Sequence, residues 1–141
     1  MHLSDETLEV LAGLITGESG ITPGKDGPEL ANFFDNRAEW EPFGAGFPPK
    51  GEYVRERLGV FNGSPRLKKF VERAFEAEED GVLWPDNAAV HFAPVLARDG
   101  YGLRKVRRAP IPYGATVIPA KDVYEVVRLE TPPPRRVPHS S

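Results

Sequence analysis

The apolar positions of this chain follow a helical spacing as far as Gly100 and change period after it. The clearest helical signal is the set Leu67, Phe70, Val71, Ala74 and Phe75. These residues recur at i, i+3, i+4, i+7 and i+8, which is the spacing of one buried stripe on a helix. Ser64-Pro65 offers an N-cap followed by proline at the first helical position, so we expect a helix over 65–75. The preceding Asn62-Gly63 can adopt the left-handed conformation that ends a helix.

The same signals predict three helices before this one. Ser4 should cap a first helix that stops at Gly17. Asp26 should cap a second helix, and a third should span 52–61. The segment 37–49 lies between the second and third helices and reads as a long aromatic loop.

A fifth helix and a β-region complete the expected fold. Asp86 should cap the fifth helix, which runs towards Leu96 and is kinked or shortened by Pro94. Beyond Gly100, β-prone runs separated by proline and glycine predict an antiparallel hairpin or a three-stranded wing. We therefore expect a mainly helical α+β domain, a compact bundle of about five helices followed by a small C-terminal β-hairpin.

Domain organisation follows from the same pattern. The 141 residues suit one domain over 1–130, with the helical bundle in 1–100 and the β-hairpin in 101–130. The remaining segment, 131–141, has no apolar pattern and reads as a disordered tail or a linker.

Composition narrows the classes of protein that this chain could represent. The absence of cysteine excludes disulfides, thiolate metal sites and cysteine nucleophiles. No window has the roughly 18 uninterrupted apolar residues of a membrane span, and the first ten residues are acidic where a secretory signal would be basic and then apolar. We therefore expect a cytoplasmic protein that has no membrane partner.

Charge is distributed unevenly along the chain. The net charge is −3, yet residues 1–100 hold ten basic against eighteen acidic residues, and residues 101–141 hold eight against three. This polarity can align a partner, steer an acidic ligand, or draw the two parts of the chain together.

The sequence contains few residues of the types that carry out catalysis. Histidine occurs only as His2, His91 and His139, of which the first and last lie near the ends of the chain. A three-histidine zinc site or a Ser-His-Asp triad is therefore not expected, and His91 reads as a surface or packing residue. We predict no catalytic residue, no metal site and no cofactor, and hence no enzyme.

Two features remain as candidate binding residues. The first is a basic ribbon, defined as Arg104, Lys105, Arg107 and Arg108, which a strand would expose to phosphates or to an acidic partner. The second is the aromatic loop, which could form a lid on the core or a binding surface. Its candidate residues are Trp40, Phe43 and Phe47.

Several motifs also resemble a known bacterial family. The most specific motif is Gly46-Phe47-Pro48, which is followed about fifteen positions later by Asn62-Gly63-Ser64-Pro65. Further matching segments are 14–23 and 27–30 upstream of this motif and 99–103 downstream of it. Over roughly residues 8–103 this pattern resembles the N-terminal domain of AbiJ-type abortive-infection proteins, which act in phage defence. The resemblance implies a domain that senses infection or mediates association with an effector, without an assigned active site.

Two functions follow from these observations. The first is a non-enzymatic recognition or adaptor module of a phage-defence system, which associates with a protein partner or effector or senses an infection trigger. The alternative is a winged-helix-like nucleic-acid-binding protein whose wing is the basic ribbon at 104–108.

Overall fold

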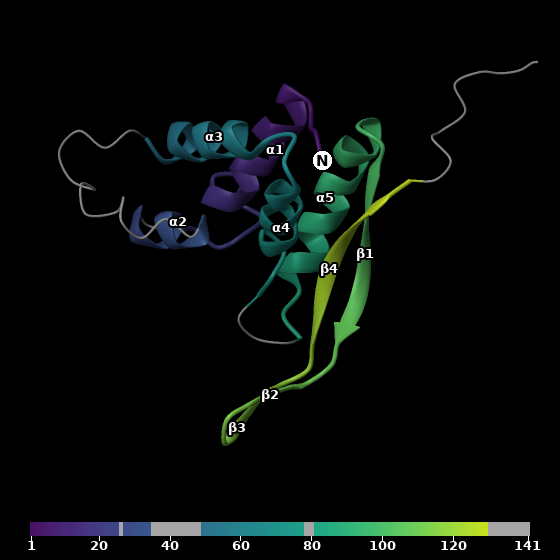
Figure 1. Ribbon diagram of the computed structural model, residues 1–141. Coiled ribbons are helices and arrows are strands. Elements are labelled where there is room, and N and C mark those ends of the chain that lie inside the picture. The colour runs from purple at the N-terminus through teal and green to yellow at the C-terminus, as the bar shows by residue number, and fades with distance from the viewer. Residues whose placement is uncertain (26, 35–48, 78–80, 130–141) are drawn as a thin grey trace, which may run out of the picture.

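The protein combines a group of helices with a long β-hairpin (Figure 1). A computed structural model describes residues 1–25, 27–34, 49–77 and 81–129. The helices are α1 (Asp5–Thr16), α2 (Gly27–Phe33), α3 (Lys50–Phe61), α4 (Pro65–Arg73) and α5 (Trp84–Arg98). The strands are β1 (Tyr101–Arg108), β2 (Ile111–Tyr113), β3 (Thr116–Ile118) and β4 (Lys121–Arg128). The expected α+β class, with helices first and an antiparallel hairpin last, is confirmed.

Both predicted ends of α1 are confirmed. The Ser4 hydroxyl accepts a hydrogen bond from the Thr7 N–H at 3.3 Å, and acidic residues occupy the first turn. Gly17 ends the helix with φ of 86°. A Cβ at Gly17 would lie only 2.6 Å from the Gly24 Cα, so glycine is required there by backbone crowding as well as by conformation.

The junction between α3 and α4 differs in detail from its prediction. Gly63 has the expected positive φ of 87°, but Asn62 is extended. The Asn62 side chain instead exchanges two hydrogen bonds with the backbone of Leu3, at 2.8 and 2.9 Å. Ser64 occupies the N-cap position of α4, yet its hydroxyl donates to the Phe61 carbonyl at 2.7 Å and makes no capping bond. This junction therefore holds the N-terminal segment against the helices.

The predicted apolar stripe at 65–75 forms the centre of the core. Its five apolar residues are at most 2% exposed, although the helix itself ends at Arg73 and the last two lie in the following turn. The Phe70 ring packs against Phe61, Phe34 and Phe33, with centroid distances of 4.9, 5.1 and 6.2 Å. This aromatic cluster joins α2, α3 and α4.

The predicted cap of α5 and the predicted shortening at Pro94 are wrong. The helix begins at Trp84 with Leu83 as N-cap, so Asp86 lies in the first turn and is not the cap. Pro94 does not shorten the helix, which continues to Arg98. Proline removes the N–H that would bond the Val90 carbonyl. Because Val90 is 76% exposed, water can satisfy that carbonyl.

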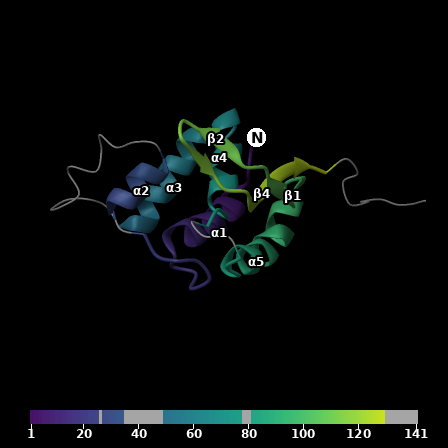
Figure 2. The same cartoon turned by 90° about the horizontal axis from the view of Figure 1, so that it is seen from below.

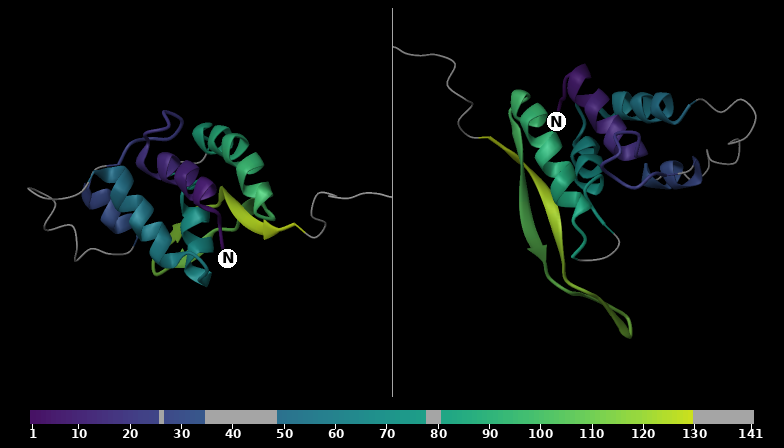
Figure 3. Two further views of the ribbon diagram at one scale, coloured as in Figure 1. Left: turned by 90° about the horizontal axis from the view of Figure 1, so that it is seen from above. Right: turned by 180° about the vertical axis from the view of Figure 1, so that it is seen from behind.

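The strands form one long hairpin in two hydrogen-bonded sections. β1 pairs antiparallel with β4 from Tyr101–Arg128 to Arg108–Lys121, and β2 pairs with β3 nearer the tip. The predicted hairpin is thus confirmed in place of a three-stranded wing. Figure 3 shows from behind that the β2–β3 section extends beyond the helices.

The base of the hairpin lies on two helices. β1 contacts α5 and β4 contacts α4, and Val126 of β4 is buried in the core. The Val126 N–H donates to the Glu72 carboxylate of α4 at 2.8 Å. Seen from below, α2 and α3 occupy the opposite side of the molecule from α5 and the β1–β4 pair (Figure 2).

Some expectations fall outside the described residues. These are the Asp26 cap, the aromatic loop with Trp40, Phe43 and Phe47, and the tail 131–141.

Candidate functional site

The basic ribbon lies on β1, and strand alternation divides its four residues between two faces. Lys105 and Arg107 share a face with Leu103, whereas Arg104 and Arg108 share the other. Three of the four cations are paired with acidic side chains. Arg104 forms an ion pair with Glu125, and Arg107 contacts the Asp122 carboxylate at 3.2 Å. Much of the positive charge of the ribbon is therefore compensated within the hairpin.

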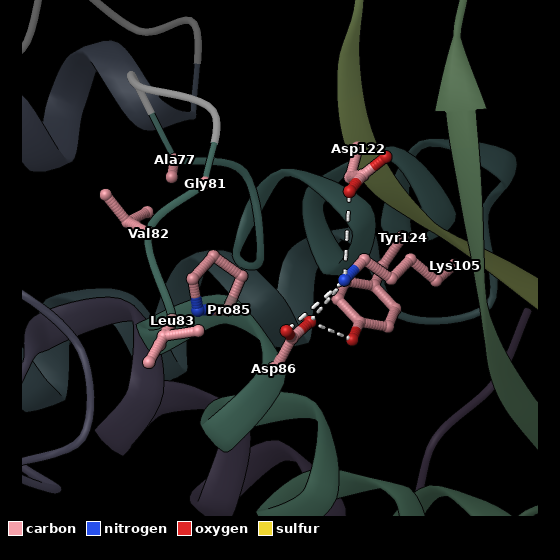
Figure 4. Close-up of a pocket in the computed structure, with 9 residues that line it drawn as sticks. All are labelled: Ala77, Gly81, Val82, Leu83, Pro85, Asp86, Lys105, Asp122 and Tyr124. Carbon is pink, nitrogen blue, oxygen red and sulfur yellow. Dashed lines mark hydrogen bonds and ion pairs between the residues drawn. The ribbon is translucent and has the colours of Figure 1, made fainter.

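Lys105 belongs to a polar cluster, defined as Asp86, Lys105, Asp122 and Tyr124, which lies where the long strands meet α5 (Figure 4). Its ammonium lies 3.1 Å from Asp86 of α5 and 3.8 Å from Asp122 of β4. The Tyr124 hydroxyl donates at 2.6 Å to Asp86 Oδ1, the same oxygen that lies 3.1 Å from the Lys105 ammonium. The cluster thus connects the first turn of α5 to both long strands.

The electrostatics of the cluster favour an ionised Asp86 and a neutral Tyr124. Hydrogen bonds from Tyr124 and Lys105 hold the pKa of Asp86 below its ordinary value. Desolvation, together with the hydrogen bond to Asp86, raises the pKa of Tyr124 to about 12. Asp86 is therefore a carboxylate and Tyr124 a neutral phenol near neutral pH.

A cavity of about 160 Å³ lies beside this cluster. Val82, Leu83 and Pro85 form its apolar side, and Lys105, Asp122 and Tyr124 its polar side. Ligand pockets usually measure about 300–1,000 Å³, so this cavity would accept at most one small side chain or a few waters. Because its polar groups bond one another, the cluster is suited to fastening the hairpin.

The candidate catalyst His91 lies exposed on α5, as expected for a surface residue. Within the part of the chain that the structure describes, no group of three or more metal-binding side chains comes together. No helix in that part is long and apolar enough to cross a membrane.

The structure reveals a surface that the sequence reasoning missed. We define the arm as residues 109–120, which contain no charged residue and include the β2–β3 section. All of 111–118 is exposed, and four large apolar side chains are among them. They are Ile111 (42%), Tyr113 (71%), Val117 (60%) and Ile118 (39%). The uncharged run of twelve residues was the signal that could have identified this surface.

The register assigns the arm side chains to two faces. Ile111 pairs with Ile118 and Tyr113 pairs with Thr116, so these four share one face, while Pro112 and Val117 share the other. Gly114, with φ of 61°, occupies the first position of the two-residue turn, where a type II′ hairpin favours glycine. The arm thus presents apolar groups in a defined arrangement.

Comparison of the chain with protein-family models, with curated proteins and with solved structures gives no match. The resemblance to the AbiJ-type N-terminal domain therefore stays a prediction that rests on the sequence motifs.

Proposed function

We propose that this chain is a non-enzymatic recognition or adaptor module that associates with a protein partner through the arm. The observation that carries the proposal is the projection of an uncharged, apolar hairpin beyond the helices (Figure 1). Exposed clusters of large apolar groups are typical of interaction sites. A two-stranded hairpin is also marginally stable alone in water, and a partner that covers the arm would stabilise it.

The backbone of the arm favours recognition through its side chains. The pair Tyr113–Thr116 closes the turn, so in an antiparallel ladder the N–H positions of the next pair, Pro112 and Val117, point outward. Proline has no N–H, so Pro112 cannot donate a hydrogen bond from this edge. Pro110 and Pro119 lie two residues further along their strands, at positions whose N–H would also point outward, and they lack it as well. A partner would therefore gain little by adding a strand to this edge, and would bind the arm through its apolar faces.

The motif resemblance suggests phage defence as the process in which this association takes place. A domain of the AbiJ type would connect the detection of phage infection to an effector, and an arm that protrudes from a small domain is suited to such contact. The same proposal states that the chain has no enzymatic activity. The polar cluster supports this part of the proposal, because its titratable groups bond one another.

The alternative, nucleic-acid binding by the basic ribbon, has less support. Phosphate binding needs cations that are available to neutralise phosphates, which releases the counterions condensed on the nucleic acid. Here Arg104, Lys105 and Arg107 lie beside Glu125, Asp86 and Asp122, which would repel a phosphate backbone. The uncharged arm adds no further electrostatic attraction.

Affinity capture from lysate of the native host, carried out with and without nuclease treatment, tests the proposal. The wild type should retain a specific protein, which is then purified and shown to bind directly. Tyr113→Asp should abolish this binding, because it places a charge on the apolar face. Val60→Asp is the matched control, since Val60 is 63% exposed on α3, away from the arm. Equal capture by both variants, or retention of nucleic acid alone, would refute the proposal.

A further inference from the structure

A second group of exposed apolar side chains lies at the start of α5 and along it, and the proposed function does not use it. Val90 is 76% exposed, Leu83 is 70% exposed and Val82 is 38% exposed. We define the α5 face as these three residues together with their exposed neighbours on the same side of the helix. The complete set is Val82, Leu83, Asn87, Val90, His91 and Pro94. The α5 face contains no aspartate, glutamate, lysine or arginine.

The spacing of these residues places them on one side of the helix. Four of them recur at intervals of four, three and four residues from Leu83 to Pro94, which is the repeat of a helix seam that packs against a partner. At one end of the α5 face, Val82 and Leu83 also border the cavity of about 160 Å³, which has room for one small side chain. The α5 face therefore combines an apolar stripe with a small recess.

Pro94 also leaves a backbone acceptor available within the α5 face. Because proline has no N–H, the carbonyl of Val90 lacks the donor that the next helical turn would otherwise supply. Water can satisfy this carbonyl while Val90 is exposed. A partner that covers the α5 face must therefore bring an N–H of its own, since a buried acceptor without a donor is costly.

The arm matches these properties of the α5 face. It is uncharged, and it exposes large apolar side chains on both of its faces. Of the four arm positions whose N–H would point outward, three are proline, and only Val117 retains a donor. One chain thus carries an apolar surface with an available acceptor and an apolar projection with one outward donor.

The arm does not cover the α5 face of its own chain. It extends beyond the helices (Figure 3), and the Val90 side chain remains mostly exposed. The extent of the two surfaces favours a second copy as the occupant. The arm supplies twelve residues and the α5 face six, which together approach the roughly 20–30 residues that a standard interface uses on each side. Either surface alone falls well short of that size.

We propose that two copies of this chain form a closed dimer, in which the arm of each copy lies on the α5 face of the other. A two-fold axis makes the two contacts equivalent, so both apolar surfaces of both chains are buried at once. The Val117 N–H of each arm would then bond the Val90 carbonyl of the other copy. This inference rests on the proposed function, because it names a second copy as the protein that the arm binds. In the lysate experiment, the captured protein would be the host's own copy of this chain.

Light scattering during size-exclusion chromatography of the purified chain tests the inference. The wild type should form a dimer of twice the 15.6 kDa chain mass, with a Kd in the micromolar range or below. Tyr113→Asp on the arm and Val90→Asp on the α5 face should each weaken the dimer by at least about thirtyfold, because each buries a charge in an apolar contact. Val60→Asp is the matched control and should leave the dimer unchanged, since Val60 is exposed on α3 outside both surfaces.

A mixture of the two variants distinguishes arm exchange from other kinds of dimer. Val90→Asp keeps a normal arm and Tyr113→Asp keeps a normal α5 face, so a mixed dimer retains one intact contact whereas each variant alone retains none. The mixture should therefore associate more tightly than either variant alone. Circular dichroism verifies that all the variants fold.

Cross-linking locates the contact, because the chain has no cysteine of its own. Val117→Cys is mixed with Val90→Cys, one of the two carrying a tag, and treated with a short bis-maleimide. This pair should form a cross-linked heterodimer several times more efficiently than Val117→Cys mixed with Val60→Cys.

A monomeric wild type, an open polymer, or a dimer that Val90→Asp leaves intact would overturn the inference. Preferential cross-linking of Val117→Cys to itself would overturn it as well, because the arms would then pair with each other. A monomer that captures a different host protein, and loses it in Tyr113→Asp, would refute arm exchange and leave the proposed function standing. If Tyr113→Asp changes neither dimerisation nor capture, both are refuted.

Discussion

At the scale of single residues, Phe70 has the largest expected effect on stability. It is 1% exposed, and its ring contacts Phe33 of α2, Phe34 directly after that helix, and Phe61 of α3. Phe70→Ala should lower the free energy of unfolding by about 3–5 kcal/mol, because it leaves a cavity at the centre of the aromatic cluster. Lys69→Ala, on the exposed side of the same helix, should change it by less than about 0.5 kcal/mol. Denaturant unfolding measures both, and comparable values for the two variants would contradict this placement of the core.

Gly63 provides a second prediction at this scale, which concerns backbone conformation alone. A Cβ at Gly63 would have no atom within 4 Å, so only its φ of 87° opposes a side chain. Gly63→Ala should therefore cost about 1–2 kcal/mol of stability. Gly59→Ala is the matched control, because Gly59 lies inside α3 with equally open space and no positive φ. It should stabilise the protein by up to about 1 kcal/mol, so the same substitution has opposite signs at the two positions.

At the scale of elements, the hairpin is held by contacts at both of its long strands. Glu72 accepts the outward N–H of Val126 on β4, while Lys105 and Tyr124 reach Asp86 on α5. On β4, Lys121 also donates to the Ala77 carbonyl at 2.6 Å, just beyond α4. The base of the hairpin is therefore part of the folded domain, whereas the arm extends from it.

Alkaline unfolding tests the contribution of Tyr124 to this attachment. The pKa of a tyrosine is ordinarily 10.0 and that of Tyr124 in the folded protein is about 12. Between these values the unfolded chain loses the phenolic proton while the folded chain retains it. The free energy of unfolding should therefore fall as the pH rises through this window. In Tyr124→Phe the decline should be shallower, which denaturant titrations at pH 9 to 12 would measure. Parallel curves for the two proteins would show that the raised pKa does not stabilise the hairpin.

At the scale of the whole molecule, ion pairs in the folded protein partly compensate the uneven distribution of charge along the sequence. Lys105 of the basic end pairs with Asp86, which belongs to the acidic first hundred residues. Other pairs, such as Arg104 with Glu125, remain within the hairpin. Electrostatic attraction between the two parts of the chain thus contributes to its assembly.

Reversal of the basic ribbon to glutamate tests this role. Three of the four new carboxylates would lie beside Glu125, Asp122 and Asp86, so hydrogen exchange at β1 and β4 should accelerate markedly. The corresponding glutamine variant removes the pairs without adding repulsion, and should show a smaller effect. The wild type should bind duplex DNA no more tightly than about 10⁻⁴ M at physiological salt. A sub-micromolar, sequence-dependent complex that the reversed variant loses would favour the nucleic-acid alternative.

The sequence by itself determined the local features of this protein. The apolar spacing of 67–75, the proline at 65 and the glycines at 17 and 63 act through neighbouring residues and steric limits, so they could be interpreted without a fold. The change of period after Gly100 likewise located the hairpin. Even here, competition for hydrogen bonds altered details, since Asn62 pairs with Leu3 and the Ser64 hydroxyl with Phe61.

Only the tertiary structure decided which distant residues meet. Glu72 and Val126 are 54 positions apart, and Tyr124 and Asp86 are 38 apart, so no local pattern indicates that either pair will bond. The convergence of Lys25 and Arg73 on Phe33 depends in the same way on how α1, α2 and α4 pack. The physical reason is that helix and strand signals depend on a few adjacent residues. The pairing of charges and the shape of a cavity arise only after the apolar faces of separate elements have been buried together.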